Sequence, residues 1–226
     1  MDSNLDWKDL TVAMITLNEE KAVAKVIKDI QRVVPGAEVL LVDSSSDATP
    51  QIAESLGAKV IRQVPPRGYS AAMDAALRAG SGKVVVTLDC DDTYPTERIP
   101  ELARMVLEDG YDIVDASRLK SKPAAMPWIN YFANYGFALM ASVLFLCRVT
   151  DLHSGMRAYR KSLIDRLVFN TRGPALPVEL LLRPIKLGAR FKLLFIDYRE
   201  RIGVSKLVVF QSAWWTLRRI LSVRFS

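Results

Sequence analysis

The chain has 226 residues, half of them apolar, so it is long enough to bury a sizeable core and is not a disordered chain. Lysine and arginine number 31 against 25 acids, and the formal charge of +6 favours phosphate-bearing partners such as nucleotides or lipid headgroups. Two widely separated cysteines and a single histidine argue against a disulfide framework and a multi-histidine metal site. A reducing compartment is therefore expected.

The first half of the chain alternates short apolar runs with segments of helical spacing. Strands are expected at residues 11–16, 38–42, 59–61 and 84–88, and helices at residues 19–33, 50–56 and 69–79. Short, continuously apolar strands separated by helices are typical of a parallel sheet covered on both faces. The pattern predicts an α/β fold.

The regular alternation ends after a further strand expected near residues 112–115. A basic, proline-containing loop, a long apolar helix, a polar segment, a helix, a strand and a final helix are expected at residues 117–127, 128–147, 151–157, 178–187, 191–196 and 208–226. No internal repeat or flexible linker interrupts the chain. We expect one domain, with a donor half (about 8–120) and an acceptor, membrane-facing half (about 121–226).

The apolar stretch at residues 128–147 is borderline in length for a membrane span, which needs about 20 apolar residues. It contains Asn130 and Asn134, so a buried or interfacial helix is favoured over a spanning one. The tail at residues 208–226 mixes tryptophans with arginines, which suits a membrane interface or a helix that covers the core. The first nine residues carry three acids and predict no secretory signal. A cytoplasmic protein associated peripherally with a membrane is expected.

An acidic cluster, Asp89-Cys90-Asp91-Asp92, follows the strand expected at residues 84–88. In open parallel sheets, ligands bind beyond the carboxyl ends of the strands. Asp43 and the loop at residues 65–68 follow other expected strands, so these clusters should converge. Carboxylates are hard ligands for Mg²⁺ or Mn²⁺, which commonly bridges phosphates. The cluster predicts a metal site built from Asp91, Asp89 and Asp92.

A series of short blocks in a fixed order carries a family resemblance. The blocks are ITLNE (15–19), LVDSSSDAT (41–49), RGYSAA (67–72), TLDCDDTYP (87–95), DIV with Ser117-Arg118 (112–118), DLHSGMR (151–157) and RIGVSKL (201–207). The chain resembles the family 2 glycosyltransferases of the GT-A fold, and among them the dolichyl- and polyprenyl-phosphate sugar transferases. The resemblance implies a Rossmann-like, mostly parallel sheet and a metal-dependent hexosyltransferase.

The resemblance also implies where the donor, a UDP- or GDP-linked sugar, would lie. Residues near the nucleoside would be Thr16, Asn18 and Glu19, with Asp43 hydrogen-bonded to the base. Gly68 would let the backbone pass close to the donor, Asp89 would face the ribose or sugar, and Asp91 would bind the metal. The family often has Gln where Thr93 stands, which leaves the third metal ligand open, with Asp92 as a substitute. Contacts to donor or acceptor phosphates would come from Arg118, Arg201, Ser205 and Lys206.

The acceptor decides which residues are catalytic. A polyprenyl phosphate is already anionic and needs no strong base, so the sugar would be transferred with inversion by positioning and charge neutralisation. A lipid or saccharide hydroxyl would need a general base, for which Asp151 and Glu179 are the candidates. With these two, Asp89, Asp91 and Arg201 make up the expected catalytic set. Nucleotidyl transfer and non-catalytic sugar-nucleotide binding are weaker alternatives, and no nucleic-acid motif is present.

Overall fold

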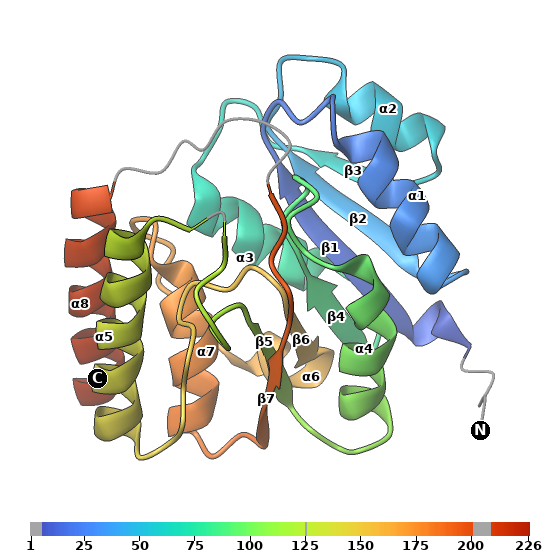
Figure 1. Cartoon of the computed structure of the whole chain (residues 1–226). Helices are drawn as coiled ribbons and strands as arrows, with labels where there is room; N and C mark the ends of the chain where they lie inside the picture. Colours follow the sequence, from blue (N-terminus) through green and yellow to red (C-terminus); the bar gives the residue numbers. More distant parts are fainter. Residues whose placement is uncertain (1–5, 125, 201–208) are drawn as a thin grey trace.

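The computed structural model describes residues 6–124, 126–200 and 209–226 (Figure 1). One seven-stranded sheet, in the order β3-β2-β1-β4-β6-β5-β7, runs through the molecule. Its strands are β1 (Leu10–Thr16), β2 (Glu38–Asp43), β3 (Lys59–Arg62), β4 (Val84–Thr87), β5 (Ile113–Ser117), β6 (Arg157–Arg160) and β7 (Phe191–Phe195). Only the two pairings of β6, with β4 and β5, are antiparallel among the described strands. The predicted mostly parallel α/β sheet is confirmed.

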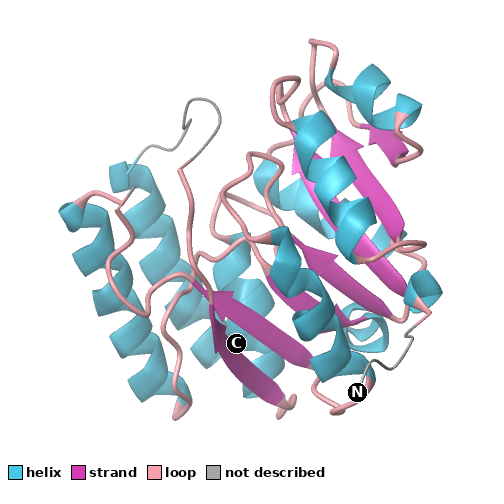
Figure 2. Ribbon diagram, turned by 45° about the vertical axis from the view of Figure 1, so that its right-hand side comes forward, coloured by secondary structure: helices cyan, strands magenta, loops and turns pink. Residues whose placement is uncertain are grey.

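Helices cover both faces of this sheet (Figure 2). They are α1 (Val23–Val33), α2 (Thr49–Ser55), α3 (Tyr69–Ala79), α4 (Ile99–Leu107), α5 (Trp128–Phe145), α6 (Lys161–Arg166), α7 (Leu176–Lys186) and α8 (Val209–Phe225), with 3₁₀ turns η1 (Trp7–Asp9) and η2 (Thr96–Arg98). Successive strand side chains point to opposite faces. Val12 and Met14 therefore pack with α1, α2 and α4, whereas Ala13 packs with α3, α6 and α7.

The helices α5 and α8 lie side by side outside α7 (Figure 1). Although α5 is the most apolar long helix of the chain, it buries only Ala138 and Ala141 fully. Among the described residues, no helix has both the length and the hydropathy needed to cross a membrane. The spanning alternative for the stretch at residues 128–147 is therefore wrong, and that stretch forms a surface helix.

The strand β6 was not expected, because its sequence Arg157-Ala158-Tyr159-Arg160 is polar. Arg157 is only 1% exposed, and its Nε donates to Asp115 on β5 at 2.5 Å. Burial raises the pKa of Asp115 to about 6, against the opposing charge of Arg157. An arginine is thus tolerated in the middle of the sheet because its charge and its donors are satisfied there.

Candidate active site

Three parallel strands, β1, β2 and β4, end at one edge of the sheet. Thr16 closes β1 and Asp43 closes β2, and these residues are partners in the parallel register. The acidic cluster follows β4, which pairs with the other side of β1. The carboxyl ends of β1, β2 and β4 therefore bring the predicted donor-side residues together.

Asp43 is fully buried and accepts hydrogen bonds from protein groups. Its Oδ1 accepts from the hydroxyls of Thr16 and Ser45, both at 2.6 Å, and its Oδ2 accepts from the backbone N–H of Ser45 at 3.1 Å. Arg62, at the end of β3, forms an ion pair with the same Oδ2. Sequence reasoning missed Arg62, although its place at a strand end was a usable signal. The expected contact of Asp43 with a base stays a prediction.

The loop after β1 is bound to the loop after β2. Asn18 has a positive φ of 59°, and its backbone N–H donates to the Ser45 hydroxyl at 2.7 Å. The side-chain oxygen of Asn18 accepts from the backbone N–H of Ser46 at 2.9 Å. Next to it, the Glu19 N–H donates to the hydroxyl of Thr49 at 2.9 Å. These bonds hold Glu19 at the sheet edge, and its expected place near the nucleoside stays a prediction.

The buried thiol of Cys90 lies among carboxylates at this edge. Burial raises the pKa of its thiol well above the usual range, and the carboxylates of Glu19, Asp91, Asp89 and Asp43 raise it further, in that order. Four predicted donor-side carboxylates thus act on one buried atom. Like charges repel, so a diphosphate placed beside these carboxylates would need a cation between them.

The expected trio of metal ligands is not assembled. The described residues contain no group of three or more His, Cys, Asp or Glu side chains that could hold a metal ion. Asp92 has a positive φ of 64° and forms an ion pair with Lys25 of α1 at 2.6 Å, so its carboxylate is engaged on α1. Asp91 is 2% exposed, and Thr93 orients its Oδ1 through a hydroxyl donor at 2.6 Å and a backbone donor at 3.2 Å.

Asp89 and Asp91 nevertheless fit a divalent cation of the Mg²⁺ or Mn²⁺ type. Such ions are usually held by one or two carboxylates, with substrate phosphates and water completing the coordination. Both side chains supply hard oxygen atoms, and both act on Cys90. Two carboxylates are enough for such a site, so Asp92 is not needed as a third ligand.

The loop at residues 151–157 closes over Asp89. A Cβ added to Gly155 would lie 2.8 Å from Oδ2 of Asp89, so only glycine allows this approach. The Gly155 N–H donates to the buried hydroxyl of Tyr94 at 2.7 Å, and its carbonyl accepts from Thr87 at 2.8 Å. The loop is thus bound on both sides to the β4 segment that carries the acidic cluster.

Arg118 and Asp151, which the sequence assigned to different roles, form one buried pair. Nε and Nη2 of Arg118 donate to the two carboxylate oxygens at 2.7 and 3.0 Å. Burial would raise the pKa of Asp151, but the charge and hydrogen bonds of Arg118, helped by His153, lower it to about 2. The guanidinium also lies 5.1 Å from the ring centroid of Tyr198. A carboxylate held in this way is a weak proton acceptor at neutral pH.

Glu179 lies in a second buried network. Its Oε1 accepts from Arg183 of α7, and its Oε2 forms an ion pair with Arg219 of α8. Arg219 also donates to the carbonyls of Asn170 and Arg172. The contacts of Glu179 hold α7, α8 and the preceding loop together, and its role as a base stays a prediction that these contacts do not favour.

Gly68 precedes α3 with φ +88° and ψ 164°, a conformation essentially confined to glycine. Its expected close approach to the donor remains a prediction. Arg201, Ser205 and Lys206, expected at the phosphates, lie outside the described residues.

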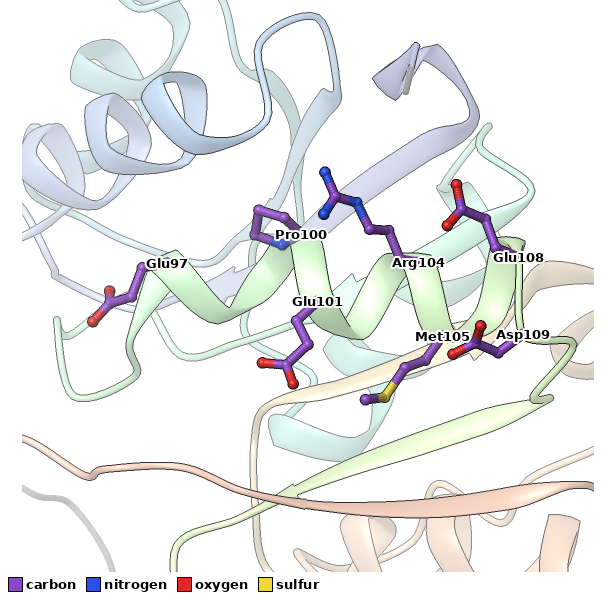
Figure 3. A pocket seen from close by; sticks show the side chains of 7 residues that line it. All are labelled: Glu97, Pro100, Glu101, Arg104, Met105, Glu108 and Asp109. Atoms are coloured by element: carbon purple, nitrogen blue, oxygen red, sulfur yellow. The ribbon is translucent and has the colours of Figure 1, made fainter. Parts of the chain in front are cut away.

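A groove of about 450 Å³ runs along the outside of α4 (Figure 3). It is lined by Glu97, Pro100, Glu101, Arg104, Met105, Glu108 and Asp109. No residue of the acidic cluster lines it, so it is separate from the site at the strand ends.

Comparisons with known proteins identify the family. The family model "Glycosyl transferase family 2" matches residues 11–168. The chain belongs to glycosyltransferase family 2. A dolichyl-phosphate hexose transferase of Haloferax volcanii is 45% identical over 89% of this chain and 87% of its own length. A dolichol-phosphate mannosyltransferase of Pyrococcus furiosus is 28% identical over 77% of this chain and 52% of its own.

Solved structures of other glycosyl-transferring synthases share this fold. A glucosyl-3-phosphoglycerate synthase from Mycobacterium tuberculosis, crystallised with Mn²⁺, UDP and phosphoglyceric acid, matches with a TM-score of 0.76 at 23% identity, over 96% of this chain and 78% of that one. A mannosyl-3-phosphoglycerate synthase from Rubrobacter xylanophilus matches with a TM-score of 0.72 at 20% identity, over 95% and 73%. The implied GT-A fold is confirmed.

Proposed function

We propose that this family 2 glycosyltransferase moves a hexose from a UDP- or GDP-linked donor to a polyprenyl or dolichyl phosphate at a membrane surface, with inversion. The observation that carries the proposal is the pairing of Asp151 with Arg118, which removes a general base from the loop that closes over Asp89. An acceptor that is already anionic needs none. The 45% identity to a dolichyl-phosphate hexose transferase supports the same acceptor class.

The proposed transfer needs no protein group as a proton acceptor. A phosphate oxygen of the acceptor attacks C1 of the sugar while the bond from C1 to the donor diphosphate breaks, and the nucleoside diphosphate leaves with the electron pair. Asp89 and Asp91 would hold a Mg²⁺ or Mn²⁺ ion, which supplies charge neutralisation for the leaving group when bound. Thr93 keeps the Asp91 carboxylate in place.

The helix α5 supports a membrane surface as the place of transfer. Six large apolar side chains on it are more than half exposed: Trp128, Ile129, Phe132, Tyr135, Leu139 and Val143. The basic loop that precedes α5 places the Lys122 ammonium 5.0 Å from the Trp128 ring centroid. Cations beside aromatic and aliphatic side chains suit an anionic lipid surface as occupant of this face.

The proposal is tested by an organic-phase transfer assay on purified protein. UDP-glucose, GDP-mannose and UDP-N-acetylglucosamine, each radiolabelled, are incubated separately with Mn²⁺ and with or without a polyprenyl phosphate. We expect one donor to label the lipid only when the prenyl phosphate is present. Asp91→Asn and removal of the metal should each lower the rate roughly 100-fold or more, because charge on the leaving group is then unbalanced.

The matched control is Asp109→Asn, an exposed carboxylate on the α4 groove, which should leave the rate unchanged. Labelling of a neutral lipid alcohol or saccharide instead, together with loss of activity in Asp151→Asn or Glu179→Gln, would replace the proposed acceptor with a hydroxyl. Equal rates in wild type and Asp91→Asn would disprove the metal site.

A further inference from the structure

A second polar cavity lies between α8 and the loop that precedes α7. Its volume is about 240 Å³, and it is lined by Asn170, Arg172, Trp215, Arg218, Arg219 and Ser222. Three of these six residues are arginines and none is acidic. The acidic cluster at the strand ends contributes nothing to its lining, so this cavity, which we call the arginine pocket, is a different site.

Contacts inside the protein hold the residues that line the arginine pocket in place. Arg219 is 4% exposed, and it donates to the carbonyls of Asn170 at 2.6 Å and Arg172 at 2.5 Å while it pairs with Glu179. Gly173, with φ +73°, lies so close to Trp215 that an added Cβ would be 2.6 Å from Cε3 of the indole. The loop is therefore held against α8.

Two positive charges of this pocket are not neutralised. Arg219 is balanced by Glu179, whereas Arg172 and Arg218 are exposed and form no ion pair with any described residue. The Arg218 guanidinium lies 5.6 Å from the Trp215 ring centroid, which orients it. Two guanidinium groups, with a serine hydroxyl and an asparagine amide beside them, match the oxygens of a phosphate group.

We propose that the arginine pocket binds a phosphate group, and that the headgroup of an anionic phospholipid supplies it. On α8, Trp214 precedes Arg218 by four residues and Leu221 follows it by three, so all three lie on one side of the helix. Trp214 is 63% exposed and Leu221 39%. An apolar surface next to a phosphate pocket suits a lipid better than a free phosphate ester. The choice of a phospholipid over a free phosphate ester rests on the membrane location in the proposed function. Phosphate binding by the pocket does not depend on that function.

The test measures binding of the full chain to vesicles of phosphatidylcholine with and without phosphatidic acid. The double variant Arg172→Gln/Arg218→Gln is compared with Arg224→Gln, which removes a charge from the same helix outside the pocket. One arginine near an anionic surface changes affinity about fivefold. We expect Arg224→Gln to lose about that much, and the double variant to lose clearly more than the roughly 25-fold that two independent charges would give. A loss in the double variant of 25-fold or less would overturn the pocket.

Inorganic phosphate distinguishes the two sources, with its binding heat in a calorimetric titration as the readout. If phosphate binds the wild type, fails to bind the double variant and displaces the vesicles, a free phosphate ester is also accepted. If it does not bind while the vesicles do, the site is specific for the headgroup. The transfer assay is read separately. A wild-type protein that binds vesicles through the pocket but transfers no sugar would disprove the proposed function and leave the pocket standing.

Discussion

Gly155 is the residue at which the loop 151–157 meets the acidic edge. We predict that Gly155→Ala lowers kcat/KM on the order of 100-fold, because its Cβ would sit 2.8 Å from the Asp89 carboxylate and displace it. Gly136→Ala on α5 is the matched control, since nothing lies within 4 Å of its Cβ position, and it should keep full activity. Kinetics on both variants check this. Normal kcat/KM in Gly155→Ala would mean that the loop can move away from Asp89 without cost.

His153 predicts an acid-sensitive component of stability. Burial lowers its pKa to about 4, with Arg118 and Arg157 adding to the effect against the charge of Asp151. The unfolded chain, with a histidine pKa of about 6.5, then binds more protons than the native state between pH 6.5 and 4, so stability falls as the pH falls through this range. Its Nε2 lies 2.8 Å from the Thr216 hydroxyl, so the ring connects the loop 151–157 to α8.

Urea unfolding at pH 7 and pH 5 measures this component. We expect the wild type to lose about 2 kcal/mol more than His153→Gln between the two values, since only the wild type must avoid protonating this ring. The comparison cancels the opposing contribution of Asp115, whose raised pKa is present in both proteins. Parallel losses in the two proteins would show that His153 takes up its proton without disturbing the fold.

The sequence could predict that the site residues lie at one edge of the sheet. It could not predict which of them pair with each other. The apolar runs located the ends of β1, β2 and β4, and the rule for parallel sheets then placed Asp43 and Asp89 at one edge. The fork between Arg118 and Asp151 joins two loops 33 residues apart, and no periodicity records such a contact. The ion pair of Asp92 with Lys25 of α1 likewise has no local signal in the sequence.

Among the elements, those with a continuous apolar pattern were predictable and β6 was not. The helix α4 was also missed, although Ile99, Leu102, Ala103 and Val106 have helical spacing and Pro100 stands in its first turn. The sequence therefore carries a signal for α4, whereas it carries no periodic signal for β6. A strand that buries an arginine shows none of the alternation on which strand prediction depends.

Replacement of Arg157 in β6 should strongly lower the stability of the fold, because this side chain is buried and fully bonded. Its Nη1 donates to the Pro177 carbonyl at 2.5 Å, and Nη2 donates to the carbonyls of Asp151 at 3.3 Å and Leu152 at 3.2 Å. We expect Arg157→Met to lower the free energy of unfolding by about 3–5 kcal/mol, because it leaves Asp115 buried and unpaired. Arg160→Met on the same strand, whose ion pair with Asp112 is about a third exposed, should cost about 1 kcal/mol or less. Denaturant titrations of both variants decide the matter, and equal losses would contradict the buried-charge argument.

For the whole molecule, we predict that a nucleoside diphosphate raises the thermal stability of the fold only when a metal ion is present. The carboxylates around Cys90 repel a diphosphate, so UDP or GDP should bind tightly only when Mg²⁺ or Mn²⁺ lies between them. With metal present, the nucleotide that matches the site, at about 100 times its Kd, should raise the melting temperature by roughly 5–10 °C. The other nucleotide should give a smaller shift, so the comparison of UDP with GDP identifies the base that the site binds.

Chelation of the metal, or Asp91→Asn with the metal present, should remove most of this shift. The substitution leaves Thr93 with an amide oxygen to bond, so the fold around β4 should persist, and the melting temperature without ligand checks that. A shift of equal size in the presence of chelator would show that backbone donors and arginines alone hold the diphosphate. The acidic edge would then serve to orient the sugar, and Asp89 and Asp91 would have to be reassigned from metal ligands to sugar contacts.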